Sequence, residues 1–557
     1  MLSRKDLLKS LLLAGVGSAT PLAFGQTGAK PESEAITLED LKSFEKVAGI
    51  SFTDAERKEI LSSVSGSRRG FEAIRKLPID YTTEPRTVFT PIGGGSEDHP
   101  KVVARPTGTK GLDLKKMSDE DIAFLSVREL GSLIRSKQLS PVRLTEIYLD
   151  RLKRYGDKLL CVVTLTEDRA RRAARQAEQE IAAGHYRGPL HGIPYGIKDL
   201  FAVKGYPTTW GANTFEHQSF DYDATVVQKL DAAGAILLAK LSMGALALGD
   251  VWFRGTTKNP FNPSQGSSGS SAGSAAGTAA GLVAFAIGTE TLGSVVSPST
   301  RCRVTGLRPT YGRTSRHGGM ALSYTMDKVG VICRQAEDTA LVLAQICGAD
   351  PLDPSAVSRS FVWPASIDPK KLKIAYTVGP NVELTDRSGI EKDPALLALQ
   401  RLGAQLQPAR FTPVPSGLLN VLNVESSSAF DAFTLGEQIR ELTNSPWPQT
   451  FRAARYVPAP EYLQMQRARS LAMEQFEKEM GDFDAVLSQG TSGQLLITTN
   501  LTGTPQIALP WGADASNNSI SRVLTGRNYQ EAKLVAIAKL VQGSADFHHL
   551  RPDLSKF

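Results

Sequence analysis

The sequence has little cysteine and no pattern of metal-binding side chains. Four cysteines occur in 557 residues, none of them in C-x-x-C spacing: Cys161, Cys302, Cys333 and Cys347. So few thiols in so long a chain exclude a disulfide framework and favour buried free thiols. A single disulfide bridge, formed after export, is the alternative. The seven histidines match no metal-ligand spacing either. We therefore expect no metal site and no cofactor.

Strong charge of one sign and long apolar runs are also scarce. The formal net charge is +7, and no basic run carries interleaved aromatic residues, so the sequence predicts no nucleic-acid partner. Beyond the first 25 residues no stretch is long and apolar enough to cross a bilayer, so we expect no stable membrane association. The Ser/Gly-rich run at 264–277 matches neither of the phosphate-binding motifs G-x-x-x-x-G-K-[ST] and G-x-G-x-x-G. The sequence therefore gives only weak support to a nucleotide-binding site.

The first 25 residues have the layout of a secretory signal peptide. A basic start at Arg4, Lys5 and Lys9 precedes the apolar stretch Leu11–Val16, and small residues end the segment at Gly25. We therefore expect export, to the periplasm or outside the cell, after removal of residues 1–25. Lys5 stands where a twin-arginine motif has its second arginine, so the twin-arginine and general routes both remain open. The alternative is an apolar helix that stays on the protein.

Two further regions follow, and they differ in character. Residues 26–115 predict an N-terminal extension, helical over Leu38–Val64 and then irregular. From residue 116 onward, short apolar runs such as Ile193–Ile197 and Ala235–Ala239 alternate with helical patterns such as Ala272–Ala286. This alternation predicts an α/β fold, a sheet sandwiched by helices.

Three segments of that region carry groups suited to one chemistry. They are the Ser/Gly-rich run Gly266–Ser274, the turn Gly288–Ser294 (GTETLGS) and Lys198 at the end of an apolar strand. A hydroxyl nucleophile needs a base for its proton and fixed N–H donors for the oxyanion that forms. Burial at a strand end would lower the pKa of a lysine toward a usable base. The plainer interpretations are a flexible Ser/Gly linker and a solvated surface lysine.

Together these segments resemble the amidase signature family of Ser-Ser-Lys hydrolases. The resemblance runs from about residue 118 to 547 and is densest from Asn259 to Arg313, with further matches at Ser323–Val331 and Thr499–Pro505. It implies a large mixed, mostly parallel central sheet flanked by helices, with residues 116–557 as the catalytic domain.

The resemblance also implies roles for single residues. Ser294 would be the nucleophile that forms an acyl-enzyme, and Lys198 the base. Ser270, 24 positions before Ser294, would relay the proton from a cis Gly269–Ser270 bond, with Ser271 and Ser268 as alternatives. The oxyanion hole would be formed by the backbone N–H groups of Thr291, Leu292, Gly293 and Ser294. The substrate pocket would be lined by Thr209, Trp210 and Gly211, unless Trp210 is ordinary core.

One departure from the family pattern concerns the support of the nucleophile turn. The position two after the nucleophile, usually arginine, is Val296 here. That arginine usually pairs with an acid in the preceding turn, here Glu290. We therefore expect Glu290 either to find another arginine (Arg301, Arg303 or Arg308) or to stay hydrated.

The resulting expectation is an exported serine amidohydrolase that cleaves a small-molecule carboxylic amide, or an ester or carbamate by the same route. One alternative is the A-subunit-type glutaminase of a tRNA-dependent amidotransferase, which a true signal peptide would exclude. Another is a non-catalytic amide-binding protein on the same fold. The sequence fixes neither the acyl and amine groups of the substrate nor the oligomeric state.

Overall fold

The computed structural model describes residues 35–79, 89–108 and 111–557, and the predicted signal peptide lies outside the described residues. The chain divides into two compact units. The helical unit comprises residues 35–79 together with 321–325 and 413–475. The sheet unit comprises residues 89–320, 326–412 and 476–557. The boundaries predicted at residues 25 and 115 stay predictions.

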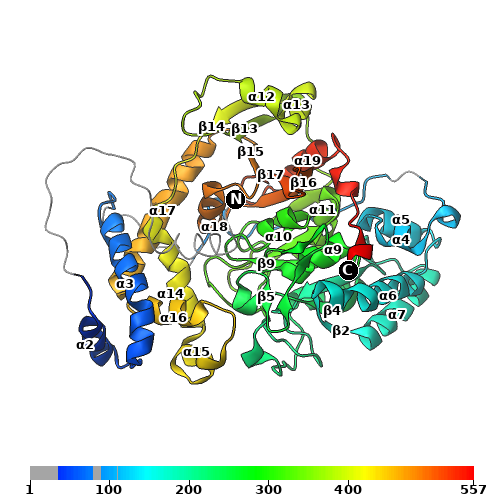
Figure 1. The fold of residues 1–557 in the computed structure, drawn as a ribbon. Helices are drawn as coiled ribbons and strands as arrows, with labels where there is room; N and C mark the ends of the chain where they lie inside the picture. The colour runs from blue at the N-terminus through cyan, green and yellow to red at the C-terminus, as the bar shows by residue number, and fades with distance from the viewer. Residues whose placement is uncertain (1–34, 80–88, 109–110) are drawn as a thin grey trace. The chain divides into compact units, whose positions relative to one another are not determined.

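In the described part of the sheet unit, eleven strands form one mixed sheet in the order β14-β13-β15-β17-β16-β10-β11-β9-β3-β4-β2 (Figure 1). Their bounds are β2 Val162–Leu165, β3 Pro194–Lys198, β4 Ile236–Leu241, β9 Phe285–Glu290, β10 Thr305–Arg308, β11 Lys328–Cys333, β13 Lys373–Thr377, β14 Gln405–Ala409, β15 Ala485–Gln489, β16 Gln506–Ala513 and β17 Ser519–Thr525. Short two-stranded ladders lie outside this sheet: β1 (Val102–Ala104) with β12 (Phe361–Trp363), β5 (Val251–Trp252) with β6 (Gly255–Thr256), and β7 (Lys258–Asn259) with β8 (Asn262–Gly266).

The strand directions differ from the mostly parallel sheet that we expected. β3 is parallel to both of its neighbours, and so is β13, whereas the other pairings in the described sheet are antiparallel. The reason lies in the connections. β16 and β17 are consecutive strands joined by a five-residue turn, which only antiparallel neighbours allow, because a parallel pair needs a long crossover.

Helices of the sheet unit pack on the sheet and on one another. α6 and α7 lie against β2 and β4 at one end, and α11 packs on β10, β11 and α19 (Figure 1). The bounds are α4 Asp119–Ala123, α5 Val127–Arg135, α6 Pro141–Leu159, α7 Glu167–Ala182, α8 Thr225–Ala232, α9 Ala272–Ala279, α10 Val296–Arg301, α11 Ala336–Ile346, α12 Ser388–Lys392, α13 Pro394–Arg401, α18 Gln494–Thr502 and α19 Glu531–Gln542.

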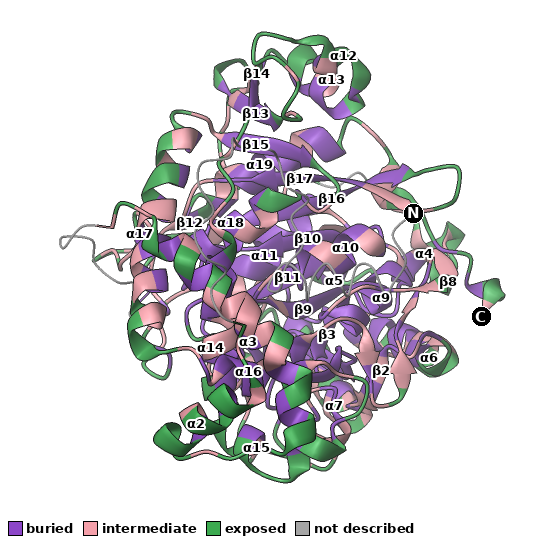
Figure 2. Ribbon diagram, turned by 60° about the vertical axis from the view of Figure 1, so that its left-hand side comes forward, coloured by how far each residue is buried: buried purple, intermediate pink, exposed green. Residues whose placement is uncertain are grey.

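The helix predicted over Ala272–Ala286 is shorter in the structure. α9 ends at Ala279, Gly281 takes a left-handed conformation with φ 65°, and the chain re-enters the sheet as β9. β9 pairs with β3 on one side and β11 on the other and is largely buried (Figure 2). A short apolar run fits a helix or a buried strand equally well, and pairing on both edges decided in favour of the strand.

The helical unit shares a hydrophobic core between the predicted N-terminal extension and a distant part of the chain. Its helices are α2 Leu38–Ala48, α3 Asp54–Arg75, α14 Asn420–Ala429, α15 Asp431–Leu435, α16 Trp447–Ala454 and most of α17 Ala459–Met480. Leu41, Ile60 and Val64 pack with Ala453 and Tyr456 in one buried cluster. In the described residues, no helix combines the length and the apolar character that crossing a membrane requires.

Candidate active site

Lys198 stands at the end of β3, where the strand runs between two parallel neighbours. Its side chain is fully buried, and its Nζ lies 2.8 Å from Ser270 Oγ and 2.9 Å from Thr289 Oγ1. β3 sets the position of the lysine, the turn before α9 that of the serine, and β9 that of the threonine. Three segments distant in sequence therefore meet at one ammonium group.

Burial lowers the pKa of Lys198 to about 7 from the ordinary 10.5, because the charged form loses its water. The nearby negative charges of Asp327 and Glu290 act in the opposite direction but do not offset the burial. Lys198 forms no ion pair within the described parts of the chain. A large fraction of this lysine is consequently neutral near pH 7 and able to accept a proton.

The three serines considered for the proton relay occupy different positions. Ser270 follows a cis peptide bond with Gly269 and contacts Lys198. The Ser271 hydroxyl instead exchanges hydrogen bonds with the backbone of Thr289, donating to its carbonyl at 3.0 Å and accepting from its N–H at 3.1 Å. Ser268 is left-handed, with φ 61°, and its N–H donates to Asp250. Ser270 is thus the serine whose hydroxyl meets the lysine.

Glycine at position 269 is required by a close approach of two backbone segments. A Cβ there would lie 1.8 Å from the carbonyl oxygen of Gly249. No side chain can occupy that space, so the sequence Gly269-Ser270 lets the serine turn lie directly against the 244–250 segment.

Ser294 lies in the turn between β9 and α10, next to the serine turn. The Ser271 N–H donates to the Ser294 carbonyl at 3.1 Å, which ties the two turns together. Within the described residues, the N–H groups of Thr291, Leu292, Gly293 and Ser294 donate to no other protein group. N–H groups that are not used within the protein are what an oxyanion would require.

Glu290 resolves the question raised by Val296. Its Oε1 accepts from Arg308 at 2.6 Å and from Asn500 Nδ2 at 2.9 Å. Its Oε2 accepts from the N–H groups of Val295 and Val296 at 2.8 and 2.9 Å. Of the expected outcomes, pairing with Arg308 is the one the structure contains. Val296 therefore supports the turn through its backbone, and the guanidinium comes from β10.

The residues predicted to line the substrate pocket form a tight loop beside β3. Asp199, which follows Lys198, accepts hydrogen bonds from the N–H and the hydroxyl of Thr209. Trp210 and Gly211 are both left-handed, with φ 51° and 69°. The Trp210 ring lies against Phe215, with centroids 4.8 Å apart.

Two residues of the site were not singled out from the sequence. Thr289 lies inside the GTETLGS motif, but nothing in the motif indicates that its hydroxyl faces Lys198. Lys240 is fully buried on β4 and pairs with Asp199 at 2.8 Å. A lysine inside an apolar strand run is a detectable sign of a buried partner, since lysine is rarely buried unpaired.

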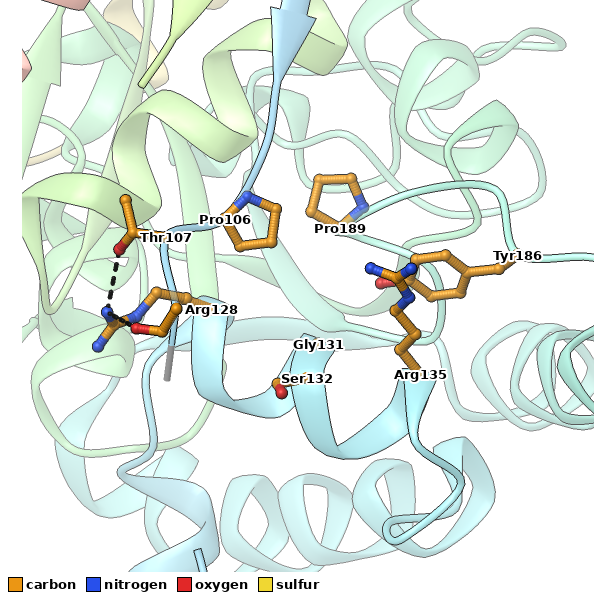
Figure 3. Close-up of a pocket in the computed structure, with 9 residues that line it drawn as sticks. Pro106, Thr107, Arg128, Gly131, Ser132, Arg135, Tyr186 and Pro189 are labelled. Atoms are coloured by element: carbon orange, nitrogen blue, oxygen red, sulfur yellow. Dashed lines mark hydrogen bonds between the residues drawn. The ribbon is translucent and has the colours of Figure 1, made fainter. Parts of the chain in front are cut away.

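The sheet unit also contains a separate cavity of about 270 Å³ (Figure 3). Its lining residues lie within 106–108, 128–135 and 186–189. Arg128 and Arg135 from α5 enter it, and the Arg135 guanidinium stacks 5.7 Å from the Tyr186 ring centroid. Arg128 is already bound by Thr107 Oγ1 and the Gly108 carbonyl, each at 3.2 Å. None of the residues predicted for the active site lines this cavity.

Among the cysteines, Cys302 contacts the serine turn, where its thiol donates to the Ser267 carbonyl at 3.6 Å. All four are free thiols, and burial raises the pKa of Cys302 far above its ordinary value, so its thiolate is disfavoured. Across residues 35–79, 89–108 and 111–557, no group of three or more His, Cys, Asp or Glu side chains could hold a metal ion.

Comparison with known proteins gives consistent matches. The Amidase family model matches residues 143–494. The A subunit of glutamyl-tRNA(Gln) amidotransferase from Thermosynechococcus vestitus is 31% identical over 482 residues, covering 77% of this chain and 99% of that protein. Native peptide amidase from Stenotrophomonas maltophilia superposes with a TM-score of 0.65 at 25% identity, covering 75% of this chain and 96% of the other. An amidase family protein from Bacillus anthracis gives a TM-score of 0.67 at 25% identity, covering 80% and 95%.

Proposed function

Because this chain belongs to the Amidase family, we propose that it hydrolyses a linear carboxylic amide through an acyl-enzyme on Ser294. The observation that carries the proposal is the contact of the buried Lys198 Nζ with Ser270 Oγ at 2.8 Å. A lysine with a pKa of about 7 can act as a base at neutral pH, and the serine turn lies against the Ser294 backbone.

In the first half of the reaction, Ser294 Oγ attacks the amide carbonyl carbon. The Ser294 proton passes to Ser270 Oγ, and the Ser270 proton passes to Lys198 Nζ. The carbonyl oxygen becomes an oxyanion that accepts hydrogen bonds from backbone N–H groups of the turn at 291–294. When the tetrahedral intermediate collapses, the C–N bond breaks and the amine leaves with the proton returned from Lys198 through Ser270.

The second half releases the acid. Water attacks the ester carbon of the acyl-Ser294, giving up its proton along the same Ser270–Lys198 route. The ester C–O bond then breaks, Ser294 recovers its proton, and the carboxylic acid leaves. Each oxyanion donor in such a site contributes about 3 kcal/mol to the barrier reduction. An ester or a carbamate would follow the same steps with a different leaving group.

Export is part of this proposal and comes from residues 1–25. The basic start, apolar stretch and small-residue end support a signal peptide whose removal delivers the enzyme to the periplasm or the exterior. N-terminal sequencing of the protein recovered from its native host tests this directly. A mature chain that begins near Gln26 is expected, and a retained Met1 contradicts export.

The mechanism is tested by labelling with a fluorophosphonate probe and measuring intact mass. The wild-type protein should gain one adduct, and Ser294→Ala should gain none while keeping its fold. Ser264→Ala, which alters an exposed serine before the serine turn, is the matched control and should label normally. Labelling that persists in Ser294→Ala would show that another residue is the nucleophile.

The curated relatives favour a second candidate, the glutaminase component of an amidotransferase. The T. vestitus protein is named as one component of such an enzyme, and 99% of its length aligns here. Glutamine as substrate and copurifying partner proteins would support this candidate. Turnover of aryl or peptide amides by the isolated chain, without glutaminase activity, would support the hydrolase.

A further inference from the structure

The sheet unit buries two lysines on adjacent strands, and their surroundings differ. Lys198 on β3 contacts hydroxyl groups, as described above. Lys240 on β4 lies 2.8 Å from Asp199 Oδ1, and both side chains are fully buried. Asp199 directly follows Lys198 in the sequence, so the partner of Lys240 is the residue next to the proposed base.

Lys240 and Asp199 together hold the backbone of the 207–211 loop. Besides Asp199, the Lys240 ammonium donates to the Pro207 carbonyl and to Thr208 Oγ1, each at 2.5 Å. The ammonium thus lies beside three oxygen atoms, one of them from the carboxylate. The other carboxylate oxygen, Asp199 Oδ2, accepts from the Thr209 N–H at 2.9 Å and from its hydroxyl.

The loop held in this way has a conformation that needs support. Trp210 and Gly211 are consecutive left-handed residues, and a side chain rarely adopts such a φ unless its surroundings impose it. The Gly211 N–H donates to Thr209 Oγ1 at 3.2 Å. The ion pair therefore fixes Thr209, and Thr209 in turn fixes the two residues that follow.

A continuous chain of contacts leads from this loop to Ser270. The Trp210 carbonyl accepts from the Leu246 N–H at 2.9 Å. Leu246 begins the short stretch that ends at Gly249, whose carbonyl leaves no room for a Cβ at Gly269. The serine turn also has support that does not pass through the loop, because the Ser268 N–H donates directly to Asp250 at 2.9 Å.

We propose that Asp199 and Lys240 are positioning residues that set the 207–211 loop for substrate binding and take no part in proton transfer. This rests on the proposed function, because it assumes that the loop meets the substrate. Lys198 moves the proton, whereas Lys240 is held in place by a carboxylate, a carbonyl and a hydroxyl. Removing either charge should loosen the loop and weaken binding of a large amide.

The variants are Asp199→Asn, Lys240→Met and Thr209→Val. Thr209→Val leaves the ion pair intact and removes only the Thr209 hydroxyl. It can therefore test the positioning role even if the other two variants fail to fold. For a bulky aryl amide, KM should rise about 10- to 100-fold, the loss expected for a hydrogen bond to a charged group. The apparent pKa of kcat and the rate of Ser294 labelling by a small fluorophosphonate should stay at wild-type values. Lys229→Met, which removes a part-buried lysine that donates to the carbonyls of Ile346 and Cys347, is the matched control.

Hydrogen exchange of the amides of residues 208–211 gives a readout independent of activity. Exchange should be faster in all three variants than in the wild type and unchanged in Lys229→Met. Unchanged exchange and unchanged KM would overturn the inference, and so would a shift in the pH profile, which would place Lys240 in the proton path. Absence of wild-type labelling would count against the proposed function alone, while the exchange result would still decide the positioning role.

Discussion

Lys198 and Ser270 make a buried contact of 2.8 Å between an amine and a hydroxyl, and the lysine has no carboxylate paired with it in the described residues. An ammonium without a counter-ion in a buried site is disfavoured, which lowers the pKa of Lys198 to about 7. The arrangement thus provides a base at neutral pH without histidine.

Activity should depend on pH through this lysine. The neutral amine is the form that accepts the Ser270 proton, so kcat should rise with pH through an apparent pKa of about 7 and level off above it. A series of initial rates from pH 5 to 9 measures this, with protein stability checked at each pH. A flat profile would mean that a different group is the base.

Replacing the lysine should remove most of the activity. A general base contributes about 10²- to 10⁴-fold, and Lys198→Ala should lose at least that much in kcat. Lys204→Ala, which alters an exposed lysine paired with Asp221 at the surface, is the control and should keep full activity. Near-normal turnover in Lys198→Ala, measured on a correctly folded protein, would contradict the proposed relay.

The Glu290–Arg308 pair should make stability sensitive to acid. Burial by itself would raise the pKa of Glu290, but Arg308 and the Val296 N–H lower it to about 2 from the ordinary 4.5. A carboxyl whose pKa is lower in the folded state stabilises the fold above about pH 4.5, and this contribution is lost as pH falls toward 2. Thermal melts from pH 7 to 2 should show a steeper loss in the wild type than in Glu290→Gln.

Breaking the same pair from the other side should be costly at neutral pH. Arg308→Met leaves a buried carboxylate without its guanidinium, which typically costs about 3–5 kcal/mol. Asp221→Asn, which breaks the exposed pair with Lys204, should change the free energy of unfolding by no more than about 1 kcal/mol. Denaturant unfolding measures both, and equal effects of the two variants would refute the role assigned to Arg308.

Two glycines around α9 should respond oppositely to alanine. Gly269→Ala places a Cβ against the Gly249 carbonyl and should destabilise the protein by about 1–3 kcal/mol, the usual cost of overpacking. A Cβ at Gly277, inside α9, would lie 3.9 Å from Leu241, an ordinary contact. Gly277→Ala should therefore be neutral or stabilising by about 0.5–1 kcal/mol. Thermal unfolding of the two variants provides the comparison, and a neutral Gly269→Ala would contradict the close approach.

The N-terminal helices should be required for the stability of the helical unit. Arg57 on α3 donates to Glu45 on α2 at 2.7 and 2.9 Å, and the Tyr456 hydroxyl donates to the same carboxylate. Arg57→Met should cost about 3–5 kcal/mol, because Glu45 stays buried without its cation. The neighbouring Lys58→Met, at an exposed position, is the control. Limited proteolysis of the 35–79 segment should be faster in Arg57→Met alone.

Local sequence determined much of this protein. The strand ending at Lys198, the serine turn and the GTETLGS turn could each be located from residue types and spacing, because glycine, serine and apolar runs specify local backbone conformation. The family followed from those segments, and so did the α/β class with helices around a sheet. The sequence did not show which of Arg301, Arg303 and Arg308 pairs with Glu290, because all three lie close enough to it along the chain.

Only the tertiary structure decided which distant groups meet. The sheet order places β9 and β4 on either side of β3, which brings Thr289 to Lys198 and Lys240 to Asp199. Pairing with β3 on one edge and β11 on the other also replaced the end of the predicted helix at 272–286 with a strand. These outcomes depend on contacts across many tens of residues, whose energies come from burial and pairing in the assembled sheet. A local pattern specifies a segment, but it carries no information about the neighbour that the segment acquires on folding.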